Sequence, residues 1–180
     1  MDIQLQNDYY RMTGRKYSFC IKSIADFVFQ HQLRYMFWWR KASKKKNIFY
    51  RLILHKYSRK FGLEISNSAE IGDGLYLGHP YNITVGSGVK IGNNVNLHKG
   101  CTIGRENRGS RLGSPVLGDN VYVGINATII GGIHIGNDVM IAPGSFVNFD
   151  VPDHSVVIGN PGNIHEKTNA TQGYVAHCVE

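Results

Sequence analysis

Residues 117–148 read LGDNVYVGINATIIGGIHIGNDVMIAPGSFVN, and an aliphatic residue returns in this stretch at every sixth position. These positions are Leu117, Val123, Ile129, Ile135, Ile141 and Val147. A period of six fits neither a helix, with its 3.6 residues per turn, nor the alternation of a long strand. It is typical of short strands joined by turns, three of which form one triangular coil of a solenoid. Stacked coils would bring the aliphatic residues into one apolar column.

The same period extends upstream in two further blocks. Their aliphatic positions are Ile65, Ile71 and Leu77, followed by Val85, Ile91, Leu97 and Ile103. We therefore predict a mostly β protein built on a parallel β-helix. A glycine-rich β-sandwich is the alternative, but turn signals in sandwiches come every 8–12 residues or so.

The six-residue period is interrupted twice. Leu77 and Val85 are eight residues apart instead of six, and Ile103 and Leu117 are fourteen apart instead of twelve. Extra residues in a solenoid leave the wall as loops, often on the binding face. The first break lies within LGHPYNITVG, residues 77–86, and directly follows His79.

The composition indicates a globular chain. It has 180 residues, of which 42% are hydrophobic, and no apolar run approaches the roughly 20 residues of a membrane span. The first residues do not resemble a signal peptide. Cys20, Cys101 and Cys178 are odd in number and widely spaced, which favours a reducing, cytoplasmic setting.

Charge divides the chain into two parts. Residues 1–62 hold 14 Lys and Arg against three acidic residues, whereas residues 63–180 hold six against ten. We expect a basic, aromatic-rich helical segment over 1–62, a β-helix over 63–162 with a loop at 104–116, and a C-terminal tail over 163–180. Two apolar helical faces are predicted, from Ile21, Ile24, Ala25, Val28 and Phe29 and from Phe49, Leu52, Ile53 and Tyr57.

Residues 40–60 carry a run of basic side chains with no acid among them. The bases are Arg40, Lys41, Lys44, Lys45, Lys46, Arg51, Lys56, Arg59 and Lys60. Such a run can attract the inner face of a membrane or a polyanion. A solvated helical face is the alternative, and we expect no nucleic-acid partner.

Two of the eight histidines are candidates for chemistry. His79 opens the first break, and His98 follows a core position one coil later, so both should lie near one corner. An imidazole there can take the proton of a hydroxyl that attacks an acyl carbon. The alternative is two histidines stacked by chance, and we expect the other six to be ordinary helical or surface residues.

The second break, GRENRGSRLGSP at residues 104–115, is polar and glycine-rich. Its arginines, Arg105, Arg108 and Arg111, suit a phosphorylated ligand, and its length suits a flap. A solvated excursion is the alternative. The segment lacks the GK[ST] ending of a P-loop.

Residues 64–162 resemble the hexapeptide-repeat acyltransferases, including serine acetyltransferase and the polysaccharide O-acetyltransferases. The resemblance is carried by LGHPYNITVG, by the step from Ile103 to Leu117 and by VVIGNPGNI at residues 156–164. It implies a left-handed β-helix, a homotrimer and acetyl-CoA bound between neighbouring β-helices, with no metal. It also implies that His79 is the general base and that Glu64 supports it.

Further site residues follow from the resemblance and from the two breaks. For the acceptor substrate we predict His98, Asn82, Arg105, Arg111 and Ser114. For acetyl-CoA we predict Gly124, Ala142, Asn160, Pro161 and Lys167, with the CoA phosphates near the loop arginines or near His165 and Lys167.

The acceptor is the point on which the sequence departs from serine acetyltransferase. Gly78 stands where the serine enzymes have an aspartate, and Ser114 stands where they have a second histidine. We therefore expect an acetyl-CoA-dependent O-acetyltransferase acting on a sugar hydroxyl or a capsular or exopolysaccharide precursor, and the alternative is a serine O-acetyltransferase of cysteine biosynthesis. Direct attack on the thioester is expected, because Cys101 takes a core position.

Two other classes of protein remain as alternatives. Metal-dependent hydration, as in γ-type carbonic anhydrases, would need a histidine pairing that this sequence lacks. A non-catalytic scaffold would not bind CoA.

Overall fold

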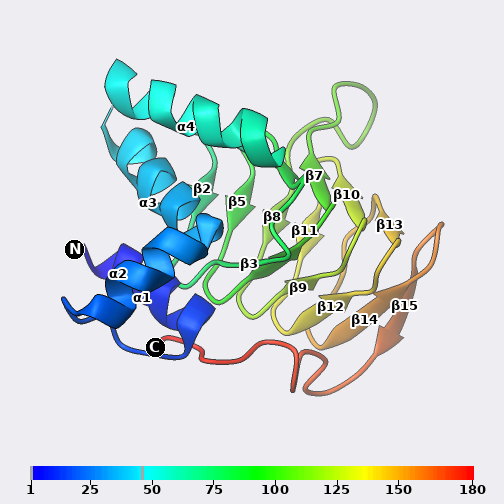
Figure 1. Ribbon diagram of the computed structural model, residues 1–180. Coiled ribbons are helices and arrows are strands. Elements are labelled where there is room, and N and C mark those ends of the chain that lie inside the picture. Colours follow the sequence, from blue (N-terminus) through cyan, green and yellow to red (C-terminus); the bar gives the residue numbers. More distant parts are fainter. Residues whose placement is uncertain (1, 46) are drawn as a thin grey trace.

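The computed structural model describes residues 2–45 and 47–180. Lys46, one of the bases of residues 40–60, lies outside the described residues. Four helices come first: α1 (Ile3–Thr13), α2 (Ile21–Phe29), α3 (His31–Lys44) and α4 (Ile48–Phe61). Short strands follow and stack into a prism, with the helices gathered at its first coils (Figure 1).

Three sheets form the walls of the prism. Sheet A contains β1 (Glu64–Ile65), β4 (Thr84–Val85), β7 (Thr102–Gly104), β10 (Thr128–Ile130) and β13 (Phe146–Val147). Sheet B contains β2 (Glu70–Ile71), β5 (Lys90–Ile91), β8 (Val116–Leu117) and β11 (His134–Ile135). Sheet C contains β3 (Tyr76–Gly78), β6 (Asn96–His98), β9 (Tyr122–Val123), β12 (Val139–Ile141), β14 (Ser155–Ile158) and β15 (Asn163–Glu166). The predicted fold class, a left-handed parallel β-helix with N-terminal helices, is confirmed.

Successive strands within a sheet pair in register through their core residues. Val85 pairs with Ile103, and Leu97 pairs with Val123. All thirteen predicted core positions are buried, none more than 8% exposed. The repeat thus forms a continuous apolar column along the axis of the prism.

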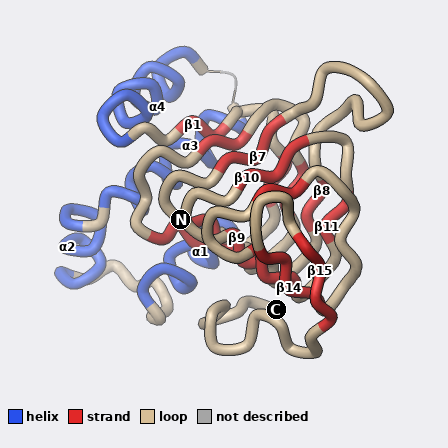
Figure 2. Tube along the Cα trace, turned by 90° about the vertical axis from the view of Figure 1, so that its right-hand side faces the viewer, coloured by secondary structure: helices blue, strands red, loops and turns tan. Residues whose placement is uncertain are grey.

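The chain passes from sheet C to A, from A to B and from B to C at three corners, which we name the CA, AB and BC edges. The first break adds two residues at the CA edge. The insertion at the second break is longer than we expected. Ile103 pairs with Ile129, 26 residues further along the chain, whereas the preceding coil, from Val85 to Ile103, takes 18 residues. The step from Ile103 to Leu117 is therefore one six-residue side with eight inserted residues, which project from the AB edge (Figures 1 and 2).

The helices close the first coil through a buried ion pair. Arg40 of α3 bonds to both carboxylate oxygens of Asp8 of α1, at 2.9 and 3.0 Å. The same guanidinium donates to the carbonyls of Ile71 and Gly72, and Asp8 accepts from the amide of Leu75. Backbone groups at the open end of the solenoid are satisfied in this way.

Much of the two predicted apolar faces of the helices is exposed. Ile21 is 85% exposed and Phe29 is 83% exposed. On α4, Phe49 and Leu52 are also exposed, and Leu54 and Phe61 are the buried residues instead. No helix in the described part of the chain has the length and apolar character needed to cross a membrane.

The tail turns back along the prism. β15 is antiparallel to β14, and the segment beyond it returns to the helices (Figure 1). Asp138 accepts from the amides of Ala170 and Thr171, and Asn94 exchanges two hydrogen bonds with the backbone of Val179. The tail beyond β15 is therefore fixed at two points.

Candidate active site

His79 lies at the CA edge, where the two extra residues form an outward bulge in the wall of the β-helix. Its φ of 47° places it in the left-handed region, and its side chain is exposed. Asn, Asp and His adopt this backbone more readily than other side chains do, and His79 is one of nine such residues in the described part of the chain. The break in the repeat therefore presents an imidazole at the surface.

The helices hold this bulge. The Nε2 atom of His31 in α3 lies 3.1 Å from the carbonyl oxygen of Pro80. Its ring stacks on Phe61, at 4.0 Å between centroids, and lies 5.1 Å from Tyr81. We had expected His31 to be an ordinary helical residue, and only its contacts across the fold reveal this position.

Asn82 also belongs to the bulge, but its contacts are structural. Its amide donates to the carbonyl of Phe61, and its side chain lies against Gly62, the residue that ends α4. The bulge is thus attached to the end of α4 as well as to α3.

His98 lies beside His79, one coil further along. It pairs in register with Gly78, and a Cβ on Gly78 would collide with Nδ1 and Cε1 of the His98 ring. Burial lowers the pKa of His98, and the neighbouring charge of His79 lowers it further. Its Nε2 atom is buried and has no hydrogen-bond partner among the described residues.

Three residues predicted to bind CoA lie along the same edge. The register places Gly124 after His98, and Ala142 after Gly124, on successive coils of sheet C. The backbone of the next coil approaches Gly124 closely, since a Cβ there would meet the nitrogen of Pro143 at 2.6 Å. Asn160, joined to Pro161 by a cis peptide bond, continues this line at the turn after β14.

Lys167 is not part of this line. Its amide donates to the carbonyl of His154, which precedes β14 at the BC edge, so the width of sheet C separates it from Asn160. His165 pairs with Val156 on the outer strand of sheet C. The structure therefore does not bring these two residues together with the other predicted CoA positions.

The loop residues lie at another edge. Arg105 and Arg111 are exposed on the excursion at the AB edge, and the Ser114 hydroxyl donates to the carbonyl of Ser87 at 2.8 Å. A strand of sheet A separates this edge from His79. Within one chain, these three predicted acceptor residues do not join His79 and His98.

Glu64 opens β1 and is exposed. Its amide donates to the carbonyl of Ile83, the last residue of the bulge, but no hydrogen bond joins the described side chains of Glu64 and His79. Glu64 also lines a groove of about 700 Å³ between α4 and sheet A, together with Arg51, His55 and Arg59. The pattern of repeats gave no signal of this groove, because it depends on how α4 packs.

A second cavity, of about 410 Å³, borders His98 on the outer side of sheet C. Tyr76 and Tyr122 of the sheet line it, and Tyr174 of the tail covers part of it. The rings of His98 and Tyr122 are 4.6 Å apart.

Cys101 is fully buried, and burial raises the pKa of its thiol to about 12. A protonated, enclosed thiol is a poor nucleophile, in agreement with direct attack by the acceptor. Across residues 2–45 and 47–180, no group of three or more His, Cys, Asp or Glu side chains is placed to hold a metal ion.

Comparison with known proteins supports the class indicated by the fold. Residues 114–148 match the family described as bacterial transferase hexapeptide (six repeats). This match and the β-helix confirm the predicted resemblance to the hexapeptide-repeat acyltransferases.

The particular relatives are serine acetyltransferases. The chain is 32% identical to serine acetyltransferase of Bacillus pumilus over 138 residues, which is 76% of this chain and 61% of the relative. It is similar to the Neisseria gonorrhoeae serine acetyltransferase in complex with serine, with a TM-score of 0.76, 27% identity and coverage of 89% of this chain and 67% of the other. It also resembles a serine acetyltransferase in complex with CoA, with a TM-score of 0.63, 26% identity and coverage of 74% and 55%.

These relatives overturn our expectation of a sugar or polysaccharide acceptor, since they are serine acetyltransferases in both comparisons. We had taken the differences from the serine enzymes at Gly78 and Ser114 as evidence against serine as the acceptor, and that interpretation was wrong. The comparisons also give no support to a glycan partner or to membrane contact. The chain spans between about a third and three fifths of the length of the curated relatives it matches.

Proposed function

We propose that this chain transfers the acetyl group of acetyl-CoA to the hydroxyl of L-serine. The observation that carries the proposal is similarity to serine acetyltransferases across the β-helix and most of the helical segment, including structures bound to serine and to CoA. The exposed His79 at a bulge of the same β-helix supplies a group suited to that reaction.

In the proposed reaction, His79 accepts the proton of the serine hydroxyl as the oxygen attacks the acetyl carbon. The bond from that carbon to sulfur then breaks, and the proton held on His79 can pass to the departing thiolate of CoA. Glu64, whose backbone is tied to the end of the bulge, would orient the imidazole and stabilise its charged form. No covalent acyl-enzyme is required.

The predicted CoA positions form a line at the CA edge. Gly124 and Ala142 occupy matching positions on successive coils, and Asn160 and Pro161 follow β14 at the same edge. We assign Gly124, Ala142, Asn160 and Pro161 to CoA, and leave Lys167 out of this set because it lies at the BC edge.

We further propose that the active unit is a homotrimer. Arg105, Arg111 and Ser114 lie across sheet A from His79, so they can reach the same substrate only if a second copy places its loop beside the CA edge. Closed rotational symmetry would repeat such a contact three times.

The acceptor can be tested by identifying the acetylated product. Wild-type protein with acetyl-CoA and L-serine should give O-acetylserine, detected by mass spectrometry. 3-Hydroxypropionate, which has the carboxylate and hydroxyl but no ammonium group, is the matched control acceptor. Product from the control but not from L-serine would overturn the assignment of the acceptor.

A further inference from the structure

The apolar side of α2 faces away from the protein. Phe19, just before the helix, is 87% exposed, and Ile24 and Val28 are 52% and 58% exposed. Together with Ile21 and Phe29 they present five large apolar side chains. A contiguous apolar surface of this kind usually marks an interaction site.

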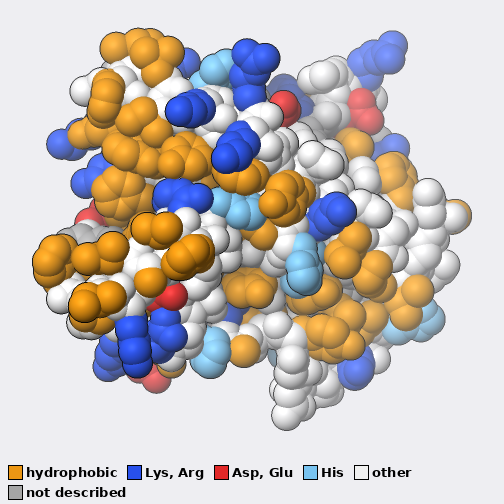
Figure 3. Space-filling view, in the orientation of Figure 1, with side chains coloured by type: hydrophobic (Ala, Val, Ile, Leu, Met, Phe, Trp, Pro, Cys, Tyr) orange, Lys and Arg blue, Asp and Glu red, His pale blue; other side chains and the backbone are white. Residues whose placement is uncertain are grey.

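Part of α4 extends this surface. Its exposed apolar side chains are Ile48, Phe49 and Leu52. Ring contacts across α3 connect the two helices: Phe27 lies 6.3 Å from Phe37, and Trp38 lies 6.4 Å from Phe49. We call the eight exposed side chains of α2, α4 and Phe19 the helical apolar face, and Figure 3 shows apolar side chains gathered over these helices with basic ones among them.

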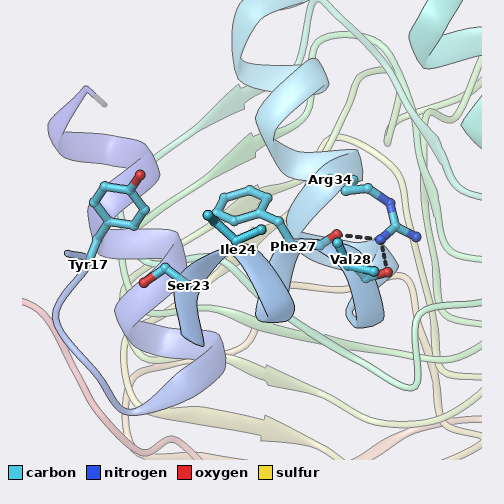
Figure 4. Close-up of a pocket in the computed structure, with 6 residues that line it drawn as sticks. All are labelled: Tyr17, Ser23, Ile24, Phe27, Val28 and Arg34. Atoms are coloured by element: carbon cyan, nitrogen blue, oxygen red, sulfur yellow. Dashed lines mark hydrogen bonds between the residues drawn. The ribbon is translucent and has the colours of Figure 1, made fainter. Parts of the chain in front are cut away.

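The surface beside α2 is hollowed as well as apolar. Figure 4 shows Ile24, Phe27 and Val28 lining a hollow of about 460 Å³, with Tyr17 at one end. At the other end Arg34 of α3 donates to the carbonyls of Phe27 and Val28. A neighbouring hollow of about 490 Å³ is lined by Phe37, Trp38 and Lys41.

The charge around this face is positive and unbalanced. Residues 1–62 contain three carboxylates, and each one is paired: Asp2 with Lys44, Asp8 with Arg40 and Asp26 with Arg15. None of the other described Lys and Arg side chains in this segment forms an ion pair. Exposed bases such as Lys22 and Lys45 therefore have no acidic partner, whereas Arg51 lines a groove with Glu64.

We infer that the helical apolar face docks on the surface of an anionic lipid bilayer. Its side chains would enter the boundary between headgroups and acyl chains, while the bases meet the anionic headgroups. A second copy of this chain is a poorer occupant, because two surfaces with an excess of bases over carboxylates would face each other with like charge.

Vesicle sedimentation tests the inference with the full chain. The probes are vesicles of phosphatidylcholine alone and of phosphatidylcholine with about one third phosphatidylglycerol. We expect binding to the anionic vesicles only, and weaker binding as salt is raised. Ile21→Ser/Phe29→Ser should reduce binding roughly tenfold or more, because two large apolar side chains are lost. Lys22→Glu/Lys45→Glu should also reduce it.

The control is Val116→Ser/Ile164→Ser, which removes two exposed apolar side chains from strands of the β-helix. It should bind vesicles as the wild type does. Absence of binding, equal binding to both vesicles, or undiminished binding of Ile21→Ser/Phe29→Ser would overturn the inference. A change in solution mass of that variant without vesicle binding would instead assign the face to contacts between copies. Acetyl transfer without vesicles should be unchanged, so this test is separate from that of the proposed function.

Discussion

The ring of His98 fills the space beside Gly78, where any larger residue would place its Cβ. The two residues pair in register on neighbouring coils, and His79 directly follows Gly78 in the chain. The glycine next to the proposed base is therefore explained by packing against His98. This contact makes position 78 and His98 a coupled pair.

A Gly78→Ala substitution tests this coupling. We expect it to lower the free energy of unfolding by about 1–3 kcal/mol, because the new methyl group collides with the His98 ring. In a His98→Ala background the same substitution should cost less than about 0.5 kcal/mol, since the obstacle is gone. Urea unfolding of the four proteins measures both values, and equal costs in the two backgrounds would refute the coupling.

The lowered pKa of His98 predicts that the stability of the protein depends on pH. Its pKa in the folded protein lies below its ordinary value of 6.5, so the unfolded chain binds the proton more readily. The contribution of His98 is therefore fully present above about pH 6.5 and is lost as the pH falls toward the folded pKa. Relative to the wild type, His98→Gln should lose less stability between about pH 7.5 and 5.5. An equal loss of stability in the two proteins over this pH range would contradict the lowered pKa of His98.

The buried pair of Asp8 and Arg40 should matter far more than an exposed one. Arg40→Met leaves a buried carboxylate without its counter-ion, and we expect it to cost about 3–5 kcal/mol. Arg15→Met breaks the exposed pair with Asp26 and should cost about 1 kcal/mol or less. Thermal unfolding of both variants measures the difference, and similar losses would show that Arg40 does not hold the helices on the first coil.

Complementation between copies tests the proposed shared site. His79→Ala and Arg105→Ala/Arg111→Ala should each be weakly active alone, the first in catalysis and the second in substrate binding. Co-expressed in equal amounts, they should recover about one quarter of the wild-type activity, because that share of contacts between copies would join an intact base to an intact loop. Activity no higher than the mean of the separate variants would place both groups in one chain.

The coils could be predicted from the sequence because the signal is local. Each aliphatic residue recurs after six positions, so the column through Ile129 and its neighbours follows from spacing alone. The length of the loop could not be predicted, because a step of fourteen fits twelve plus two as well as six plus eight. Only the pairing of Ile103 with Ile129 decides between them.

The site was harder to predict, because it is formed by contacts between residues that are distant in sequence. The bulge at His79 is visible as a break in the period, whereas the support from His31 requires α3 to pack beside Pro80. Helical periodicity likewise identified the stripe of Ile21 and Phe29 but not whether another element covers it. Reading Gly78 as a mark of the acceptor failed for the same reason, since its neighbour His98 is twenty residues away.

The role of His79 is tested by the L-serine-dependent release of CoA thiol by wild-type protein and by His79→Gln. If His79 is the general base, kcat/KM for the variant falls by about a hundredfold or more, while its circular dichroism spectrum and solution mass are retained. A folded His79→Gln protein with wild-type turnover of L-serine would contradict this role.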